Sequence, residues 1–121
     1  MKTNPLLELT KLGQSIWMDY LDRGRIASGQ LQRHIAEDGL RGVTSNPSIF
    51  QKAIMENEDY DRQIADLAGQ QQDAEEMYLA LVVQDIRDAA DVLRPTWERL
   101  EHRDGYVSLE CNPHLAYDTE G

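Results

Sequence analysis

The stretch Glu37–Pro47, EDGLRGVTSNP, carries the clearest structural signal in this sequence. Gly39 suits the C-terminus of a helix because glycine adopts a positive φ without a Cβ clash. The next residues predict a short strand, and the closing proline favours the first turn of another helix. Such a strand places Thr44, Ser45 and Asn46 at the carboxyl edge of a sheet, where α/β proteins bind ligands. The same pattern also fits polar residues that only cap the following helix.

Two further apolar runs end in a similar way. Residues 12–19, LGQSIWMD, end in Asp19, and residues 105–113, GYVSLECNP, carry Glu110 shortly before an Asn-Pro pair. Strand side chains alternate between two faces, so each run has an apolar face that helices can cover and a polar face. The apolar positions are Ile16, Met18, Val43, Val107, Leu109 and Cys111. Three strands that deliver polar groups at one end predict part of an active site.

Strands and helices are expected to alternate along the chain. The predicted strands span 15–20, 41–45 and 106–111, and the predicted helices span 5–12, 28–38, 47–56, 59–68 and 73–101. Asp73 and Glu76 have the spacing of a capping box, and Pro95 should kink or end the last helix. The alternation implies an α/β fold with parallel strands. The crossover between the second and third strands holds about two helices more than a minimal crossover requires.

Composition narrows the classes of partner. The chain has 121 residues, with 22 acidic and 12 basic side chains and a net charge of −10. This charge argues against nucleic acid, whose phosphates need positive partners. Neither a membrane span nor a signal peptide is expected, so we predict a cytoplasmic protein without membrane partners. The single cysteine, Cys111, is expected to be a buried or half-buried thiol rather than a nucleophile or a metal ligand. We expect no metal and no cofactor.

Three segments together resemble a known family. LGQSIWMDYLDR, EDGLRGVTSNPSIFQKAI and DGYVSLECNPHLAYDT are similar to the first third of a transaldolase, most of all the subgroup that occurs alone or fused to a glucose-6-phosphate isomerase. The resemblance implies a (β/α)8 TIM barrel, a fold that typically needs about 250 residues. Residues 1–121 are therefore expected to form the N-terminal part of one incomplete barrel domain, namely its first three β/α units.

The resemblance also implies a reaction. Transaldolases transfer a dihydroxyacetone unit from fructose 6-phosphate or sedoheptulose 7-phosphate to an aldose phosphate through a lysine Schiff base, in the pentose phosphate pathway. By motif, Asp19 would move the proton of the donor hydroxyl. Glu110 would hold and activate a water, with help from Thr44, and Asn46 and Ser45 would bind the substrate.

The Schiff-base lysine of the family lies on the fourth strand, beyond these residues. The chain has only Lys2, Lys11 and Lys52, and none of them ends a predicted strand. We therefore expect the segment alone to be inactive, and its unpaired barrel edges to favour homo-oligomerisation or strand exchange. Two alternatives stay open: a non-catalytic binding or regulatory module derived from a transaldolase, and another barrel enzyme acting on phosphosugars.

Overall fold

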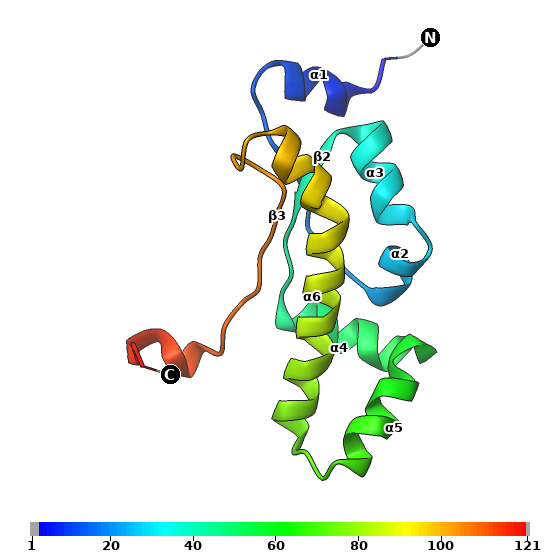
Figure 1. Ribbon diagram of the computed structural model, residues 1–121, viewed down its shortest axis with the longest axis vertical. Helices are drawn as coiled ribbons and strands as arrows, with labels where there is room; N and C mark the ends of the chain where they lie inside the picture. The colour runs from blue at the N-terminus through cyan, green and yellow to red at the C-terminus, as the bar shows by residue number, and fades with distance from the viewer. Residues whose placement is uncertain (1–2, 121) are drawn as a thin grey trace.

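The computed structural model describes residues 3–120 and has α/β architecture (Figure 1). Three parallel strands form one sheet in the order β1-β2-β3, so each strand lies beside its neighbour in the sequence. The strands are β1 (Ile16–Met18), β2 (Leu40–Val43) and β3 (Tyr106–Val107). The helices are α1 (Pro5–Lys11), α2 (Arg23–Ala27), α3 (Gln30–Asp38), α4 (Pro47–Glu56), α5 (Asp61–Gly69) and α6 (Ala74–Arg99), with 3-10 turns η1 (Glu58–Tyr60) and η2 (Pro113–Tyr117).

Local signals set the boundaries of these elements as predicted. Gly39 ends α3 in the left-handed conformation at φ 70°, which a side chain with a Cβ would adopt only with strain. At the N-terminus of α6, the Asp73 carboxylate accepts a hydrogen bond from the Glu76 amide at 2.8 Å. The Glu76 side chain in turn accepts one from the Asp73 amide at 3.1 Å, which completes the capping box. The crossover between β2 and β3 contains α4, η1, α5 and α6, which confirms the additional helices.

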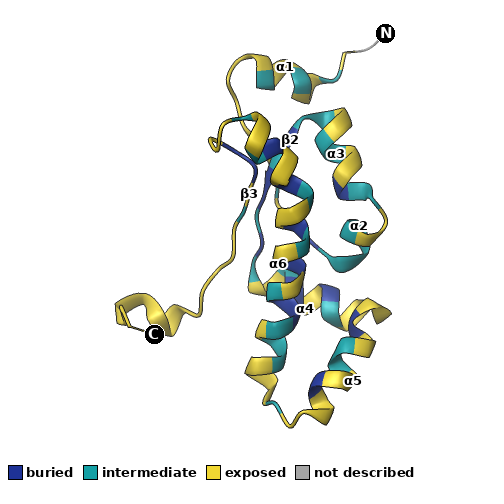
Figure 2. Cartoon of the chain, viewed as in Figure 1, coloured by how far each residue is buried: buried dark blue, intermediate teal, exposed yellow. Residues whose placement is uncertain are grey.

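One face of the sheet is covered by helices and carries the core (Figure 2). Ile16, Met18 and Val107 pack against the core cluster, as the alternation of their strands predicts. Burial of this apolar surface supplies the main driving force for folding. The buried members of the cluster are Leu21, Leu31, Leu40, Val43, Phe50, Val82, Ala89 and Leu93. A second, smaller cluster lies between α4, η1, α5 and α6 and contains Ala53, Tyr60, Leu67 and Leu81.

The third strand is shorter than the sequence predicts. It ends at Val107, and the chain then leaves the sheet and runs away from the body toward η2 (Figure 1). The last bond to β2 joins the Ser108 amide to the Val43 carbonyl at 3.0 Å. β2 ends at Val43, and no other described strand borders β3, so the following residues have no ladder to join. Leu109 is consequently 38% exposed rather than part of the core.

Cys111 lies on the same departing segment, and its thiol is exposed. The prediction of a buried or half-buried thiol is therefore wrong, because it assumed that the third strand continues to this residue. Residues 108–120 of this segment are all exposed (Figure 2).

The predicted long helix is confirmed as α6, and of the two expectations for Pro95 an end is excluded, because α6 continues to Arg99. A proline lacks only its own amide donor, so the remaining helical bonds can continue past it. One α-helix was not predicted, namely α2, since five residues are too few to show helical periodicity. Asp22 caps it by accepting a hydrogen bond from the Arg25 amide at 2.7 Å. Within residues 3–120, no helix combines the length and the hydropathy needed to cross a membrane.

The register between β1 and β2 contains an irregularity. Ile16 pairs with Leu40, whereas Trp17 pairs with Gly42, so Arg41 is one extra residue on β2. A regular strand would place Leu40 and Val43 on opposite faces, since they are three residues apart. The extra residue reverses the alternation between them, and both side chains are buried in the same core cluster.

Candidate active site

Two of the predicted catalytic residues meet at the carboxyl edge of the sheet. Asp19 directly follows β1, and Thr44 directly follows β2. The Thr44 hydroxyl donates a hydrogen bond of 2.6 Å to Oδ1 of Asp19, and the Thr44 amide donates one of 2.9 Å to the Met18 carbonyl. Asp19 is exposed, so a ligand can reach its carboxylate. A carboxylate held on one oxygen by a hydroxyl can exchange a proton through its other oxygen.

The other two predicted residues after β2 make contacts that anchor the backbone. Oδ1 of Asn46 accepts a hydrogen bond from the Ile49 amide at 2.9 Å, which caps α4. This cap uses the oxygen of Asn46 and leaves the hydrogens of its amide group to interact elsewhere. Ser45 is only 2% exposed, and its hydroxyl donates a hydrogen bond of 2.6 Å to the Ser108 carbonyl. Ser45 thus connects the end of β2 to the first residue after β3.

Glu110 lies two residues beyond that connection, on the segment that leaves the sheet. It is exposed, and among the described residues no hydrogen bond joins it to Asp19 or Thr44. Its charge acts on Tyr78 of α6. The pKa of Tyr78 is raised, first by burial and second by the charge of Glu110. The structure therefore brings Asp19 and Thr44 together and leaves Glu110 on a separate segment.

The lysines of the described residues lie on helices. Lys11 is the last residue of α1, and its ammonium group contacts Glu8 at 2.7 Å. Lys52 is exposed on α4, and Lys2 lies outside the described residues. A lysine that forms a Schiff base must keep a nucleophilic amine, which a desolvated position favours. Neither described lysine has such a position. Within residues 3–120, no three His, Cys, Asp or Glu side chains are grouped so as to hold a metal ion.

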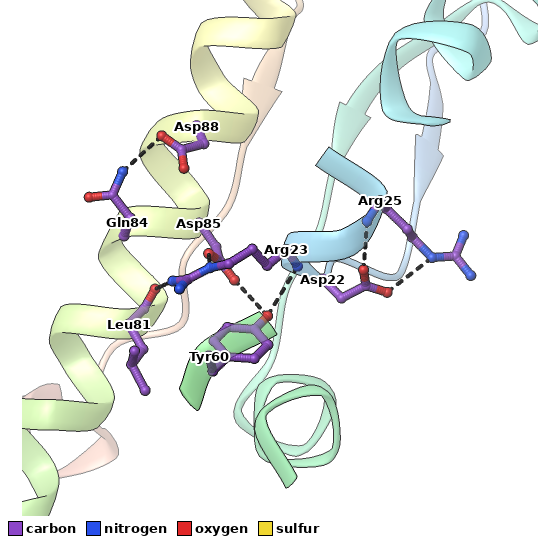
Figure 3. A network of polar contacts seen from close by, with 8 residues as sticks. All are labelled: Asp22, Arg23, Arg25, Tyr60, Leu81, Gln84, Asp85 and Asp88. Carbon is purple, nitrogen blue, oxygen red and sulfur yellow. Dashed lines mark hydrogen bonds and ion pairs between the residues drawn. The ribbon is translucent and has the colours of Figure 1, made fainter. Parts of the chain in front are cut away.

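A buried polar cluster joins α2, η1 and α6, and we call Arg23, Tyr60 and Asp85 the helical node (Figure 3). Nε of Arg23 donates to Oδ1 of Asp85 at 2.8 Å, and the Tyr60 hydroxyl donates to Oδ2 at 2.7 Å. The Arg23 amide donates to the Tyr60 hydroxyl at 3.1 Å, and the Arg23 guanidinium lies over the Tyr60 ring at 4.4 Å. Both carboxylate oxygens of Asp85 therefore have a donor, and the node connects three helical elements.

Burial determines the electrostatics of the node. The pKa of Asp85 is raised because the carboxylate is removed from water, and the donors Tyr60 and Arg23 oppose that shift. Burial and the Asp85 hydrogen bond raise the pKa of Tyr60 as well. One feature of the sequence indicates the helical node. Asp85 stands four residues after Leu81 and four before Ala89, which makes it an acid on the apolar face of α6.

The sequence has clear relatives. A model of the Transaldolase/Fructose-6-phosphate aldolase family matches residues 16–121. The chain is 52% identical over 114 residues to a transaldolase of Thiobacillus denitrificans, an alignment that covers 94% of this chain and 32% of the relative. It is 49% identical over 120 residues to a transaldolase of Trichodesmium erythraeum, with 99% of this chain and 32% of the relative covered.

A relative from Streptomyces avermitilis, named transaldolase 2, is 46% identical over 118 residues, with 98% of this chain and 32% of the relative covered. The chain thus spans about a third of the length of these relatives and matches their N-terminal part. The resemblance seen in the motifs is confirmed across nearly all residues. The chain belongs to the Transaldolase/Fructose-6-phosphate aldolase family.

Proposed function

We propose that this chain is the segment of a transaldolase that contributes the first three β/α units of a (β/α)8 barrel. The parallel order β1-β2-β3 supports this proposal, since each barrel strand lies beside the next one in the sequence. The helices of the core cover one face of the sheet, and the opposite face would line the barrel interior. Catalytic groups of such barrels lie at the carboxyl ends of the strands, which is where Asp19 and Thr44 meet.

The complete enzyme would transfer a dihydroxyacetone unit from fructose 6-phosphate or sedoheptulose 7-phosphate to an aldose phosphate. The donor carbonyl would first form a Schiff base with a lysine outside this chain. Asp19 would then accept the proton of the neighbouring hydroxyl as the C–C bond breaks and its electrons move into the Schiff base. The same carboxylate would return the proton when the new C–C bond forms. The contact between Asp19 and Thr44 is the observation that carries this assignment.

The remaining roles rest on position at the same edge. Thr44 would hold the Asp19 carboxylate and help to orient the water that Glu110 activates. The amide group of Asn46 would donate to substrate hydroxyls, while its oxygen caps α4. Ser45 would act at the edge of the substrate site, with its hydroxyl hydrogen bonded to Ser108. Glu110 would reach the site once the rest of the barrel directs its segment inward.

The same proposal includes the setting of the enzyme. Its partners would be sugar phosphates of the pentose phosphate pathway, in the cytoplasm and without a cofactor. The 121-residue chain alone would be inactive, and its free strand edges would lead to homo-oligomers or strand exchange. β1 and β3 are the edges of the described sheet, which is the observation behind this expectation.

A chimera tests the proposed activity. The aligned 114 residues of this chain would replace the matching segment of the Thiobacillus denitrificans transaldolase, which supplies the remaining strands. We expect transfer from fructose 6-phosphate to erythrose 4-phosphate, and we expect Asp19→Asn to lower kcat by about 10²- to 10⁴-fold. Asp91→Asn is the matched control, because that carboxylate is exposed on α6 and its ion pair with Arg94 lies in contact with solvent. A folded but inactive chimera would contradict the proposal and favour a non-catalytic module.

The location of the lysine is tested on the chain itself. We expect no change in its intact mass after incubation with fructose 6-phosphate and borohydride, which reduces a Schiff base to a stable adduct. A stoichiometric adduct would place the chemistry on Lys2, Lys11 or Lys52. It would also contradict the assignment of the Schiff-base lysine to a later strand.

A further inference from the structure

Trp17 and Gly42 form an unusually close pair on the sheet face that the helices leave uncovered. They are opposite one another in the register of β1 and β2. A Cβ built on Gly42 would lie 2.2 Å from Cε2 of Trp17, far below any real carbon contact. Gly42 is buried even though Trp17 itself is 39% exposed, because the indole lies across the glycine. Only glycine leaves room for the ring at this position.

The indole is also held by a chain of polar contacts that begins at its ring nitrogen. Nε1 of Trp17 donates to the Ser15 hydroxyl at 2.8 Å, and this hydroxyl donates to Oδ2 of Asp104 at 2.6 Å. The same carboxylate oxygen lies 4.0 Å from the Arg41 guanidinium, and the Arg41 carbonyl accepts the Gly105 amide at 2.8 Å. These contacts join β1, β2 and the residues just before β3. Arg41, the extra residue on β2, is thereby anchored at both its side chain and its carbonyl.

The extra residue determines which side chains meet at the carboxyl edge. If the pairing of Ile16 with Leu40 continued without an extra residue, Asp19 would stand opposite Val43. In the structure Val43 is a core residue. With Arg41 accommodated, Trp17 pairs with Gly42 and Met18 with Val43. The next pair is Asp19 and Thr44, which make the 2.6 Å hydrogen bond. The pairing of Trp17 with Gly42 is thus two residues from the catalytic pair on both strands.

We infer that Trp17 and Gly42 are positioning residues, whose contact fixes the register that brings Asp19 to Thr44. The indole fills the space above the glycine, and a register that paired Trp17 with Arg41 or Val43 would drive the ring into a side chain. The catalytic consequence rests on the proposed transaldolase function, whereas the register itself does not.

The activity test uses the chimera described above. We expect Gly42→Ala to lower kcat by at least about 10-fold below the melting temperature, since a small misplacement of a catalytic group has effects of this size or larger. The KM for fructose 6-phosphate should change much less. Gly69→Ala is the matched control, because no atom lies within 4 Å of the Cβ it would add. Adding Trp17→Ala to Gly42→Ala should restore part of kcat by making room for the methyl group.

A purely structural role of Gly42 and a positioning role predict different values of kcat in a double variant. If Gly42 acts through the Asp19–Thr44 contact, Gly42→Ala should reduce kcat little further in a Thr44→Val background. Independent, multiplicative reductions in the double variant would overturn the inference, as would an unchanged kcat in Gly42→Ala.

A measurement without turnover separates the inference from the proposed function. The Thr44 amide bonds the Met18 carbonyl across the two strands, so its hydrogen exchange reports the register. In the chimera, active or not, we expect Gly42→Ala to speed this exchange by at least about 10-fold, and Gly69→Ala to leave it unchanged. Unchanged exchange in Gly42→Ala would overturn the inference. An inactive parent chimera with a protected Thr44 amide would instead count against the proposed function alone.

Discussion

Two polar clusters of this molecule differ in their burial and in their hydrogen bonding. In the helical node, the side chain of Asp85 is 0% exposed and that of Arg23 is 19% exposed. Both carboxylate oxygens of Asp85 accept a hydrogen bond (Figure 3). At the carboxyl edge of the sheet, Asp19 is exposed, and within residues 3–120 its hydrogen-bond partner is Thr44, on one oxygen. A satisfied carboxylate in the interior holds elements together, whereas an accessible one keeps capacity to bind and to transfer protons.

The difference follows from desolvation. A carboxylate taken out of water is tolerated only with good partners, so removing one partner leaves a buried group unpaired. A carboxylate in contact with water loses little when one hydrogen bond is removed, because solvent replaces it. Substitutions in the node should therefore change the free energy of unfolding, and substitutions at the sheet edge should change activity.

The largest effect is expected for Asp85→Ala. The variant leaves the Arg23 guanidinium and the Tyr60 hydroxyl without their acceptor, and we expect the free energy of unfolding to fall by about 3–5 kcal/mol. Urea unfolding followed by circular dichroism measures this change. Asp91→Ala removes an equally charged but exposed partner of Arg94 and should change stability by no more than about 0.5 kcal/mol. Similar losses of unfolding free energy in both variants would show that the buried carboxylate contributes no more to stability than an exposed one.

Tyr60→Phe should have an intermediate effect. The ring and its contact with Arg23 stay, but Oδ2 of Asp85 and the Arg23 amide lose their partner. We expect a loss of about 1–3 kcal/mol in the free energy of unfolding, the usual result of leaving a buried polar group unpaired. Tyr117→Phe, at a fully exposed ring on η2, is the control and should leave stability unchanged. No loss in Tyr60→Phe would mean that water satisfies the node and that it is not closed to solvent.

The burial of Asp85 should also make the free energy of unfolding depend on pH, by a smaller amount than the substitutions above. Burial raises the pKa of Asp85 above its value in the unfolded chain, so the native state binds more protons between the two pKa values. The contribution of Asp85 to stability is then greatest below the ordinary aspartate pKa and falls as the pH rises through the raised pKa. The difference in unfolding free energy between the wild type and Asp85→Asn, measured by urea titration at several pH values, should decrease along that interval. A difference that grows with pH would show that the donors outweigh burial.

Local signals in the sequence were sufficient for most of the fold. The caps at Gly39 and Asp73 depend on residues within a few positions, and both form as predicted. Asn46 caps α4, which the alternative interpretation of its segment allowed. The strand order and the meeting of Asp19 with Thr44 follow from parallel strands whose carboxyl ends share one edge. The family motifs strengthened this prediction, because they matched in order along the chain.

The features that were not predictable depend on distant partners. Whether Leu109 and Cys111 continue β3 depends on a neighbouring strand, and β2 has already ended at that level. The extra residue Arg41 contacts Asp104, and its neighbour Gly42 contacts Trp17, so both partners lie far away in the sequence. Arg23 and Asp85 are 62 residues apart, so only the acid on the apolar face of α6 hinted at their pairing. The roles of Asp19, Thr44, Ser45, Asn46 and Glu110 all stay predictions.

The smallest change in stability is expected at the contact between Asp19 and Thr44, and it is the sharpest test of the contrast. Thr44→Val removes the hydroxyl that donates to Asp19 but keeps the shape of the side chain and the amide bond to Met18. Because water can take the place of the hydroxyl at the exposed carboxylate, we expect the free energy of unfolding to change by no more than about 1 kcal/mol. The measurement is urea unfolding under the conditions used for Asp85→Ala, with Asp19→Asn as the reciprocal variant. A loss as large as that of Asp85→Ala would mean that the sheet edge is held together by this pair, and Asp19 would then be a structural residue rather than an accessible acid.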